Sequence, residues 1–122
     1  MSKTVLIVDD EKEILDVLTM IFESLDYKCL TAENGEVALK KIKVKDIDLL
    51  ILDNMMPQMS GEEVLETIHR EKLKNFKIIF SSGQTMSLLQ LVNEKEYFVN
   101  IDYLLNKPFN IEKIKEALEE IN

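Results

Sequence analysis

Residues 5–10 (VLIVDD) decide the fold of this chain, because a short run of aliphatic residues stops abruptly at two aspartates. Residues 49–53 (LLILD) repeat the pattern and end at a single aspartate. Neither run alternates apolar with polar residues, as a strand with one solvent-exposed face would. Both runs therefore predict strands that are buried on both faces, the kind found inside a parallel sheet covered by helices.

The rest of the chain alternates short apolar runs with amphipathic stretches. Further strands are predicted at residues 28–32, 78–80 and 101–105. Apolar residues at helical spacing predict helices within residues 14–25, 37–42, 64–68 and 111–121, with Asn110 capping the last, and residues 85 to about 94 can form another. Because each helix then connects two strands of the same direction, we expect an α/β fold: a doubly wound, five-stranded parallel sheet in a three-layer sandwich.

Length and composition are those of one folded domain, which we place at residues 1–122. The chain has 122 residues, of which 46% are apolar and 31% charged, and this excludes a disordered tail or a collagen-like fibre. Lys and Arg number 15 against 23 Asp and Glu, which gives a net charge of −8. Such an acidic domain repels phosphate backbones, so we expect no direct binding to nucleic acid.

The sequence also carries signals about its compartment. Cys29 is the only cysteine, so it forms no internal disulfide and fits a reducing environment. The apolar run at residues 5–8 is too short for a secretory signal, and no stretch approaches the ~20 apolar residues of a membrane span. We therefore expect a cytoplasmic protein with no membrane contact.

Polar residues follow the predicted strands at the points where the strands end: Asp9, Asp10, Asp53, Ser82 and Lys107. Taken singly, each has an ordinary explanation as a turn former, a helix cap or a solvated charge. In a doubly wound sheet, however, the carboxyl ends of the strands meet at one edge, where ligands bind. The fold therefore predicts that these side chains share one site.

Three carboxylates in one small volume repel each other, by about 4 kcal/mol per pair at ~4 Å and an effective dielectric constant near 20. Such a cluster takes up protons or binds a cation, and an oxygen-only ligand set favours Mg²⁺. Lys107 and the hydroxyl of Ser82 suit further phosphate oxygens. The set therefore predicts phosphoryl transfer, with Asp53 as the nucleophile that becomes an acyl phosphate.

Four motifs together resemble the receiver domain of two-component response regulators, including the single-domain chemotaxis type: residues 5–11 (VLIVDDE), 52–61 (LDNMMPQMSG), 82–83 (SG) and 107–109 (KPF). The likeness extends over essentially the whole chain. It implies a flavodoxin-like fold with the strand order 2-1-3-4-5.

The resemblance also implies a role for each matching position. Asp53 becomes the phosphoacceptor and a metal ligand. Asp10 binds Mg²⁺ directly, Asp9 binds it partly through water, and Met55 contributes its backbone carbonyl.

Ser82 and Lys107 contact the phosphoryl group in this reading. We assign the hydroxyl role to Ser82 and not to Ser81, because the family pattern has a small residue directly after it, here Gly83. A cis peptide bond is expected between Lys107 and Pro108.

The implied function is signalling. A histidine kinase or a histidine phosphotransfer protein donates the phosphoryl group, and the domain catalyses its own Mg²⁺-dependent phosphorylation and dephosphorylation. The domain is not a metabolic enzyme. The altered conformation then controls an effector protein or domain, and the face of the fourth and fifth helices is a candidate for homodimerisation.

Two departures from the family pattern keep an alternative open. Family members usually carry Tyr or Phe at the position of Leu104, and Tyr103 lies one residue too early. The segment between Gly83 and Asp102 is also atypical. The alternative is a binding module that acts without regulated phosphorylation.

A metabolite hydrolase is disfavoured, because Met55 occupies the place of the second acid that such an enzyme needs. We expect no role for Asn54. We expect His69 to be an ordinary surface residue.

Overall fold

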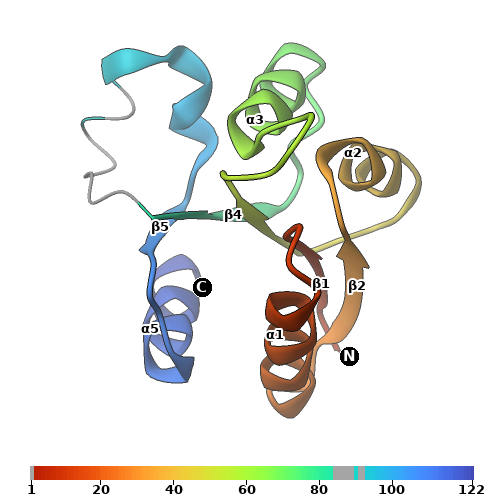
Figure 1. The fold of residues 1–122 in the computed structure, drawn as a ribbon, viewed down its shortest axis with the longest axis vertical. Coiled ribbons are helices and arrows are strands. Elements are labelled where there is room, and N and C mark those ends of the chain that lie inside the picture. The colour runs from red at the N-terminus through yellow and green to blue at the C-terminus, as the bar shows by residue number, and fades with distance from the viewer. Residues whose placement is uncertain (1, 84–89, 91–92) are drawn as a thin grey trace.

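A five-stranded parallel sheet in the order β2-β1-β3-β4-β5 forms the centre of the computed structural model, which describes residues 2–83, 90 and 93–122 (Figure 1). This architecture and strand order are the predicted ones. The elements are β1 (Thr4–Val8), α1 (Lys12–Ser24), β2 (Lys28–Ala32), α2 (Gly35–Val44), β3 (Leu49–Asp53), α3 (Gly61–Arg70), β4 (Lys77–Ser82), the 3₁₀ helix η1 (Glu96–Asn100), β5 (Tyr103–Asn106) and α5 (Ile111–Ile121).

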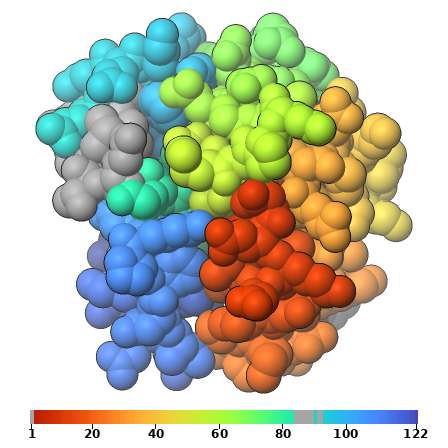
Figure 2. Space-filling model, in the orientation of Figure 1, coloured from red at the N-terminus to blue at the C-terminus, as the bar shows by residue number. Residues whose placement is uncertain are grey.

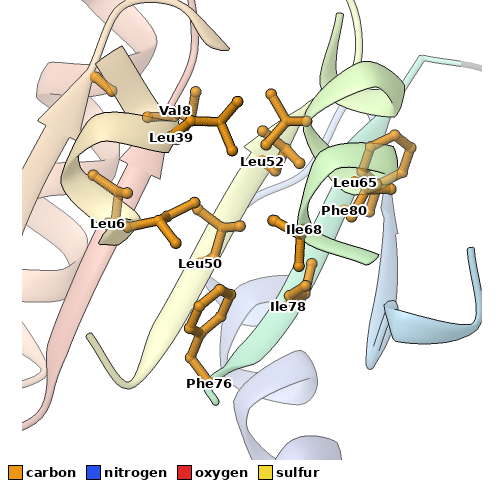
Figure 3. Packing of buried hydrophobic residues seen from close by; sticks show 14 of the residues in the cluster. Leu6, Val8, Leu39, Leu50, Leu52, Leu65, Ile68, Phe76, Ile78 and Phe80 are labelled. Atoms are coloured by element: carbon orange, nitrogen blue, oxygen red, sulfur yellow. The ribbon is translucent and has the colours of Figure 1, made fainter. Parts of the chain in front are cut away.

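Helices cover both faces of the sheet and create two separate cores. α1 and α5 lie on one face, and α2, α3 and η1 lie on the other (Figure 1). Along β3, Leu50 and Leu52 pack towards α2 and α3 (Figure 3), whereas Leu49 and Ile51 pack towards α1 and α5. The two apolar runs that predicted the fold are thus buried on both sides, as expected of parallel strands.

Side-chain caps fix where several helices begin. Asn34 accepts a hydrogen bond from the backbone N–H of Val37, and Asn110 accepts one from Lys113, as predicted for the last helix. Ser60 and Glu63 form a reciprocal capping box at the start of α3. The start of α3 is therefore defined by local interactions, directly after the loop that follows Asp53.

The fifth strand begins two residues later than predicted, at Tyr103 instead of Ile101. Residues Glu96–Asn100 form η1, and the N–H of Ile101 still donates to the carbonyl of Phe98 at its end. Asp102 then pairs with Ile78: its N–H donates to the carbonyl of Ile78, and its carboxylate accepts from the N–H of Ile78.

The fourth helix predicted at residues 85 to about 94 falls mostly outside the described residues. Among those described, no helix is long and apolar enough to cross a lipid bilayer.

Candidate functional site

The strand ends bring the predicted site residues to one edge of the sheet. Asp53 and Ser82 are the last residues of β3 and β4, Asp9 follows β1, and Lys107 follows β5. The backbone ladder aligns these ends, since the N–H of Lys107 donates to the carbonyl of Ser82 at 2.8 Å. The predicted clustering at the carboxyl edge is therefore present in the structure.

Asp9, Asp10 and Asp53 form a compact acidic cluster, with one carboxylate oxygen from each lying within 4.8 Å of the others. Asp9 and Asp53 are each only 3% exposed, whereas Asp10 faces solvent. Asp9 is held in place by the backbone N–H of Glu11, which donates to its Oδ1 atom at 2.9 Å. The cluster is thus open to solvent on the side of Asp10.

Lys107 is the cation of the site. Its Nζ atom lies 2.9 Å from Oδ1 of Asp53 and 3.5 Å from Oδ2 of Asp9. Burial raises the pKa of Asp53 above its ordinary value, the contact with Lys107 lowers it, and the charges of Asp9 and Asp10 raise it. Burial by itself lowers the pKa of Lys107, but the two carboxylates more than offset this and raise it. Lys107 therefore stays charged.

These residues fit a divalent cation. One ammonium group faces three carboxylates, so the cluster carries an excess of negative charge that a bound cation would neutralise. Oxygen ligands with an open, solvated side suit Mg²⁺, which retains several of its waters. Met55 lies in the β3–α3 loop with its side chain 70% exposed, and its carbonyl as a metal ligand stays a prediction.

Asn54, for which the sequence suggested no role, organises the loop behind the acidic cluster. Its N–H donates to the carbonyl of Ser81, and its own carbonyl accepts from the N–H groups of Met56 and Gly61. Its side-chain Oδ1 accepts from the N–H of Glu62 at 3.1 Å. Asn54 therefore ties the end of β3 to the first turn of α3. An asparagine before a predicted helix start could have signalled this, because its amide oxygen satisfies free helical N–H groups.

Gly61 allows α3 to approach Asp53 closely. A Cβ atom at position 61 would lie 2.3 Å from the backbone oxygen of Asp53 and 2.8 Å from Cα of Asn54. Both neighbours are backbone atoms and cannot rotate away. Only glycine fits this position without moving the helix or the end of β3.

Tyr103 and Leu104 lie on opposite faces of the sheet. Leu104 packs against the core shared with α2, α3 and η1, and Tyr103 packs against the core of α1 and α5. The register between β4 and β5 is continuous from Tyr103 to Asn106, with no bulge that would bring Tyr103 round. Tyr103 therefore does not occupy the place of the aromatic residue that the family pattern has at position 104.

His69 lies on α3 outside the acidic cluster. Its Nε2 atom is 3.0 Å from Oε1 of Glu96, and its Nδ1 atom is 3.2 Å from the side-chain nitrogen of Asn100. These contacts join the last turn of α3 to η1. They support the interpretation of His69 as an ordinary surface residue.

A doubly wound sheet that gathers an acidic cluster, a lysine and a hydroxyl at its carboxyl edge defines the receiver class of α/β domains. Comparison with protein families matches residues 5–119 to the response regulator receiver domain. The chain belongs to this family.

Individual relatives agree with this assignment. The alkaline phosphatase synthesis transcriptional regulatory protein PhoP of Bacillus subtilis is 31% identical over 121 residues, which are 99% of this chain and 49% of that protein. The probable C4-dicarboxylate response regulator DctR of the same organism is 37% identical over 92 residues, 75% of this chain and 39% of that protein. The chain thus spans about half or less of these curated relatives.

Solved structures of similar fold cover the whole domain. The response regulator TrrA of Thermotoga maritima, solved in complex with Mg²⁺ and BeF, is 35% identical with a TM-score of 0.82, covering 98% of this chain and 99% of that chain. The chemotaxis protein CheY4 of Vibrio cholerae is 26% identical with a TM-score of 0.86 and full coverage of both chains.

Proposed function

We propose that residues 1–122 form a receiver domain in which Asp53 accepts a phosphoryl group from a histidine kinase or a histidine phosphotransfer protein. The observation that supports this most directly is the placement of Asp53. Its carboxylate is buried between two further aspartates and the ammonium group of Lys107. Family membership and the likeness to TrrA, whose structure contains Mg²⁺ and BeF, support the same proposal.

The chemistry follows from the two oxygens of Asp53. Oδ1 is buried against Lys107, so Oδ2 is the oxygen that attacks phosphorus. The new Oδ2–phosphorus bond forms while the bond from phosphorus to the donor imidazole breaks, and that electron pair returns to the imidazole. Lys107 and the hydroxyl of Ser82 bind the charged phosphoryl oxygens. Bound Mg²⁺, held by Asp9, Asp10, Asp53 and the carbonyl of Met55, would neutralise further negative charge.

The proposal extends to location and partners. The domain acts in the cytoplasm, catalyses its own phosphorylation and dephosphorylation, and passes a conformational change to an effector protein or domain. Its net charge of −8 argues against direct contact with nucleic acid. Homodimerisation through the face of the fourth and fifth helices stays a prediction, because most of the fourth helix lies outside the described residues.

The test is intact mass spectrometry after incubation with acetyl phosphate, with and without Mg²⁺, and in parallel with purified histidine kinases. We expect a single phosphoryl group, added only with Mg²⁺, lost on treatment with hydroxylamine as an acyl phosphate would be, and mapped to Asp53. No adduct from either donor, and no change in melting temperature with a BeF–Mg²⁺ mixture, would favour the binding module. The binding module is kept as a second candidate function because position 104 carries the aliphatic Leu104 in place of the aromatic residue of the family pattern.

An apolar groove beside the site suits the protein donor. It has a volume of about 440 Å³ and runs from Ile14 and Val17 on α1 to Pro108 and Phe109 after β5. Figure 2 shows these two parts of the chain, in red and blue, meeting at the surface. Lys107 also lines the groove and reaches Asp53, so a donor that brings its phosphorylated histidine to Asp53 must cover this surface.

Replacing Val17 with glutamate is expected to slow transfer from a histidine kinase at least tenfold, because an apolar contact becomes a buried charge. Val17 is 52% exposed and contributes little to folding. Phosphorylation by acetyl phosphate should not change. Val44→Glu is the matched control, since Val44 is 75% exposed at the far end of α2. Equal transfer rates for both variants would place the docking surface elsewhere.

A further inference from the structure

Ser81 carries a buried hydroxyl that the proposed mechanism does not use. The residue is 2% exposed, and its Oγ atom has no hydrogen-bond partner among the described residues. Leaving a buried hydroxyl unpaired lowers stability, so such a group in a folded protein calls for a reason. The aliphatic residues before it on β4, Ile78 and Ile79, show that an apolar side chain suits this strand.

The sheet places Ser81 directly beside Asp53. The two residues are register partners on β4 and β3, and the N–H of Asn54 donates to the carbonyl of Ser81 at 3.0 Å. Side chains alternate along a strand, so Ser81 lies on the same face as Ile79, and Asp53 on the same face as Ile51. That is the face covered by α1 and α5, which makes Ser81 and Asp53 neighbours on one side of the sheet.

The side chains of Ser81 and Ser82 therefore lie on opposite faces of the sheet. Ser82 shares its side of the sheet with Phe80, which packs towards α3 and η1. Ser81 lies between Asp53 on β3 and Leu105 on β5. Leu105 comes two residues before Lys107 in the chain. Adjacent strands are about 4.8 Å apart, so rotation about the Cα–Cβ bond of Ser81 brings its Oγ atom within reach of the Asp53 carboxylate.

We propose that Ser81 is a positioning residue whose hydroxyl donates a hydrogen bond to Oδ1 of Asp53 when Lys107 turns to the phosphoryl group. This inference rests on the proposed function. In the described structure the polar contact of Oδ1 is its ion pair with the ammonium group of Lys107, at 2.9 Å. Once the ammonium group binds phosphoryl oxygens instead, Oδ1 loses this contact, and the Ser81 hydroxyl on the neighbouring strand is a donor that can replace it. The unpaired hydroxyl is thus kept for a different state of the site.

The hydrogen bond accelerates both formation and hydrolysis of the acyl phosphate. In hydrolysis a water oxygen attacks phosphorus, the bond from phosphorus to Oδ2 breaks, and its electron pair returns to the carboxylate, while the water proton passes to phosphate or solvent. Negative charge then grows on Oδ1, where the Ser81 hydroxyl stabilises it. In formation Lys107 leaves Oδ1 while that oxygen still carries part of its negative charge, and the Ser81 hydroxyl replaces the lost contact, which lowers this barrier as well.

The experiment measures both rates for Ser81→Ala with acetyl phosphate and Mg²⁺. We expect each rate to fall about tenfold, the effect of losing one hydrogen bond to a charged acceptor. The melting temperature of the unphosphorylated variant should equal or exceed that of the wild type, because an unpaired buried hydroxyl has been removed. Ser81→Thr, which keeps a hydroxyl, should restore the rates, whereas Ser81→Cys, which fills the space with a weak donor, should not. Ser24→Ala is the control variant, because it removes an exposed hydroxyl at the end of α1.

Wild-type rates in Ser81→Ala, in a protein whose wild type is phosphorylated at Asp53, would overturn this inference and leave the proposed function intact. Slower rates together with a lower melting temperature would show that Ser81 serves packing alone, which overturns it as well. Failure of the wild type to accept a phosphoryl group from any donor would overturn both.

Discussion

Asp53→Asn is expected to leave the protein without any phosphoryl adduct and, at the same time, to raise its melting temperature by a few degrees in the absence of divalent cations. The amide lacks the nucleophilic oxygen pair, so the loss of phosphorylation should be complete. The gain in stability comes from burial. Burial and the charges of Asp9 and Asp10 hold the pKa of Asp53 above its ordinary value despite Lys107, so its ionised form destabilises the fold.

The expected gain in melting temperature of Asp53→Asn depends on pH. A carboxyl group whose pKa is raised on folding contributes its stability below the unfolded pKa, and that contribution is lost as the pH rises through the folded pKa. At neutral pH the wild type has lost it, while the amide at position 53 carries no charge at any pH. The difference in melting temperature between Asp53→Asn and wild type should therefore shrink as the solution is acidified.

Mass spectrometry and thermal unfolding at neutral pH measure the two parts of this prediction. Asp46→Asn is the control, because it removes an exposed charge and changes the net charge equally. An adduct on Asp53→Asn would move the acceptor to another residue. A lower melting temperature would mean that the contact with Lys107 outweighs the burial of the carboxylate.

Gly61→Ala is expected to destabilise the protein by about 3 kcal/mol, which lowers the melting temperature by roughly 10 °C. The added Cβ would meet the backbone oxygen of Asp53 at 2.3 Å, and the hydrogen bond from the N–H of Gly61 to Asn54 would stretch as α3 moves. Because the displaced atom belongs to Asp53, phosphorylation by acetyl phosphate should slow as well. Chemical denaturation and the rate of adduct formation measure these effects.

The other glycines provide graded controls. At Gly35 the new Cβ would meet Cγ and Sδ of Met59 at 2.7 Å and a methyl group of Val64 at 2.9 Å. These are side-chain atoms and not backbone, so Gly35→Ala should cost less than Gly61→Ala. At Gly83 no atom of the described residues lies within 4 Å of the added Cβ, so Gly83→Ala should leave the melting temperature unchanged. If all three variants melted at the same temperature, the close approach of α3 to β3 would not be what limits position 61.

The sequence was informative where a residue's role depends on strand order alone. Parallel strands bring their carboxyl ends together, so Asp9, Asp53 and Lys107 could be assigned to one site before any distance was known. The structure places Tyr103 and Leu104 on opposite faces of the sheet, as the alternation of side chains along a strand requires. The start of β5 was misplaced because Ile101 caps η1, which ends at Asn100, and a short 3₁₀ helix leaves no periodic apolar pattern.

Other roles depend on contacts that periodicity does not encode. Asn54 lies seven residues before the start of α3, so its residue type suggests a cap, but only the structure identifies the N–H of Glu62, 3.1 Å from its Oδ1 atom, as the donor. The unpaired hydroxyl of Ser81 is visible only from its burial and its register with Asp53. Both depend on how the end of β3 meets α3 and β4 in space.

The alternation of side chains along β4 has a consequence for how such a domain can diversify. Ser81 and Ser82 are separated by one peptide unit, yet they lie on opposite faces of the sheet, Ser81 on that of Ile79 and Ser82 on that of Phe80. On the proposed function, a substitution on the face of Ser81 would change the lifetime of the acyl phosphate, because Asp53 lies on that face, whereas one on the face of Ser82 leaves this neighbour of Asp53 in place. Selection can therefore alter one face of this strand while it preserves the other.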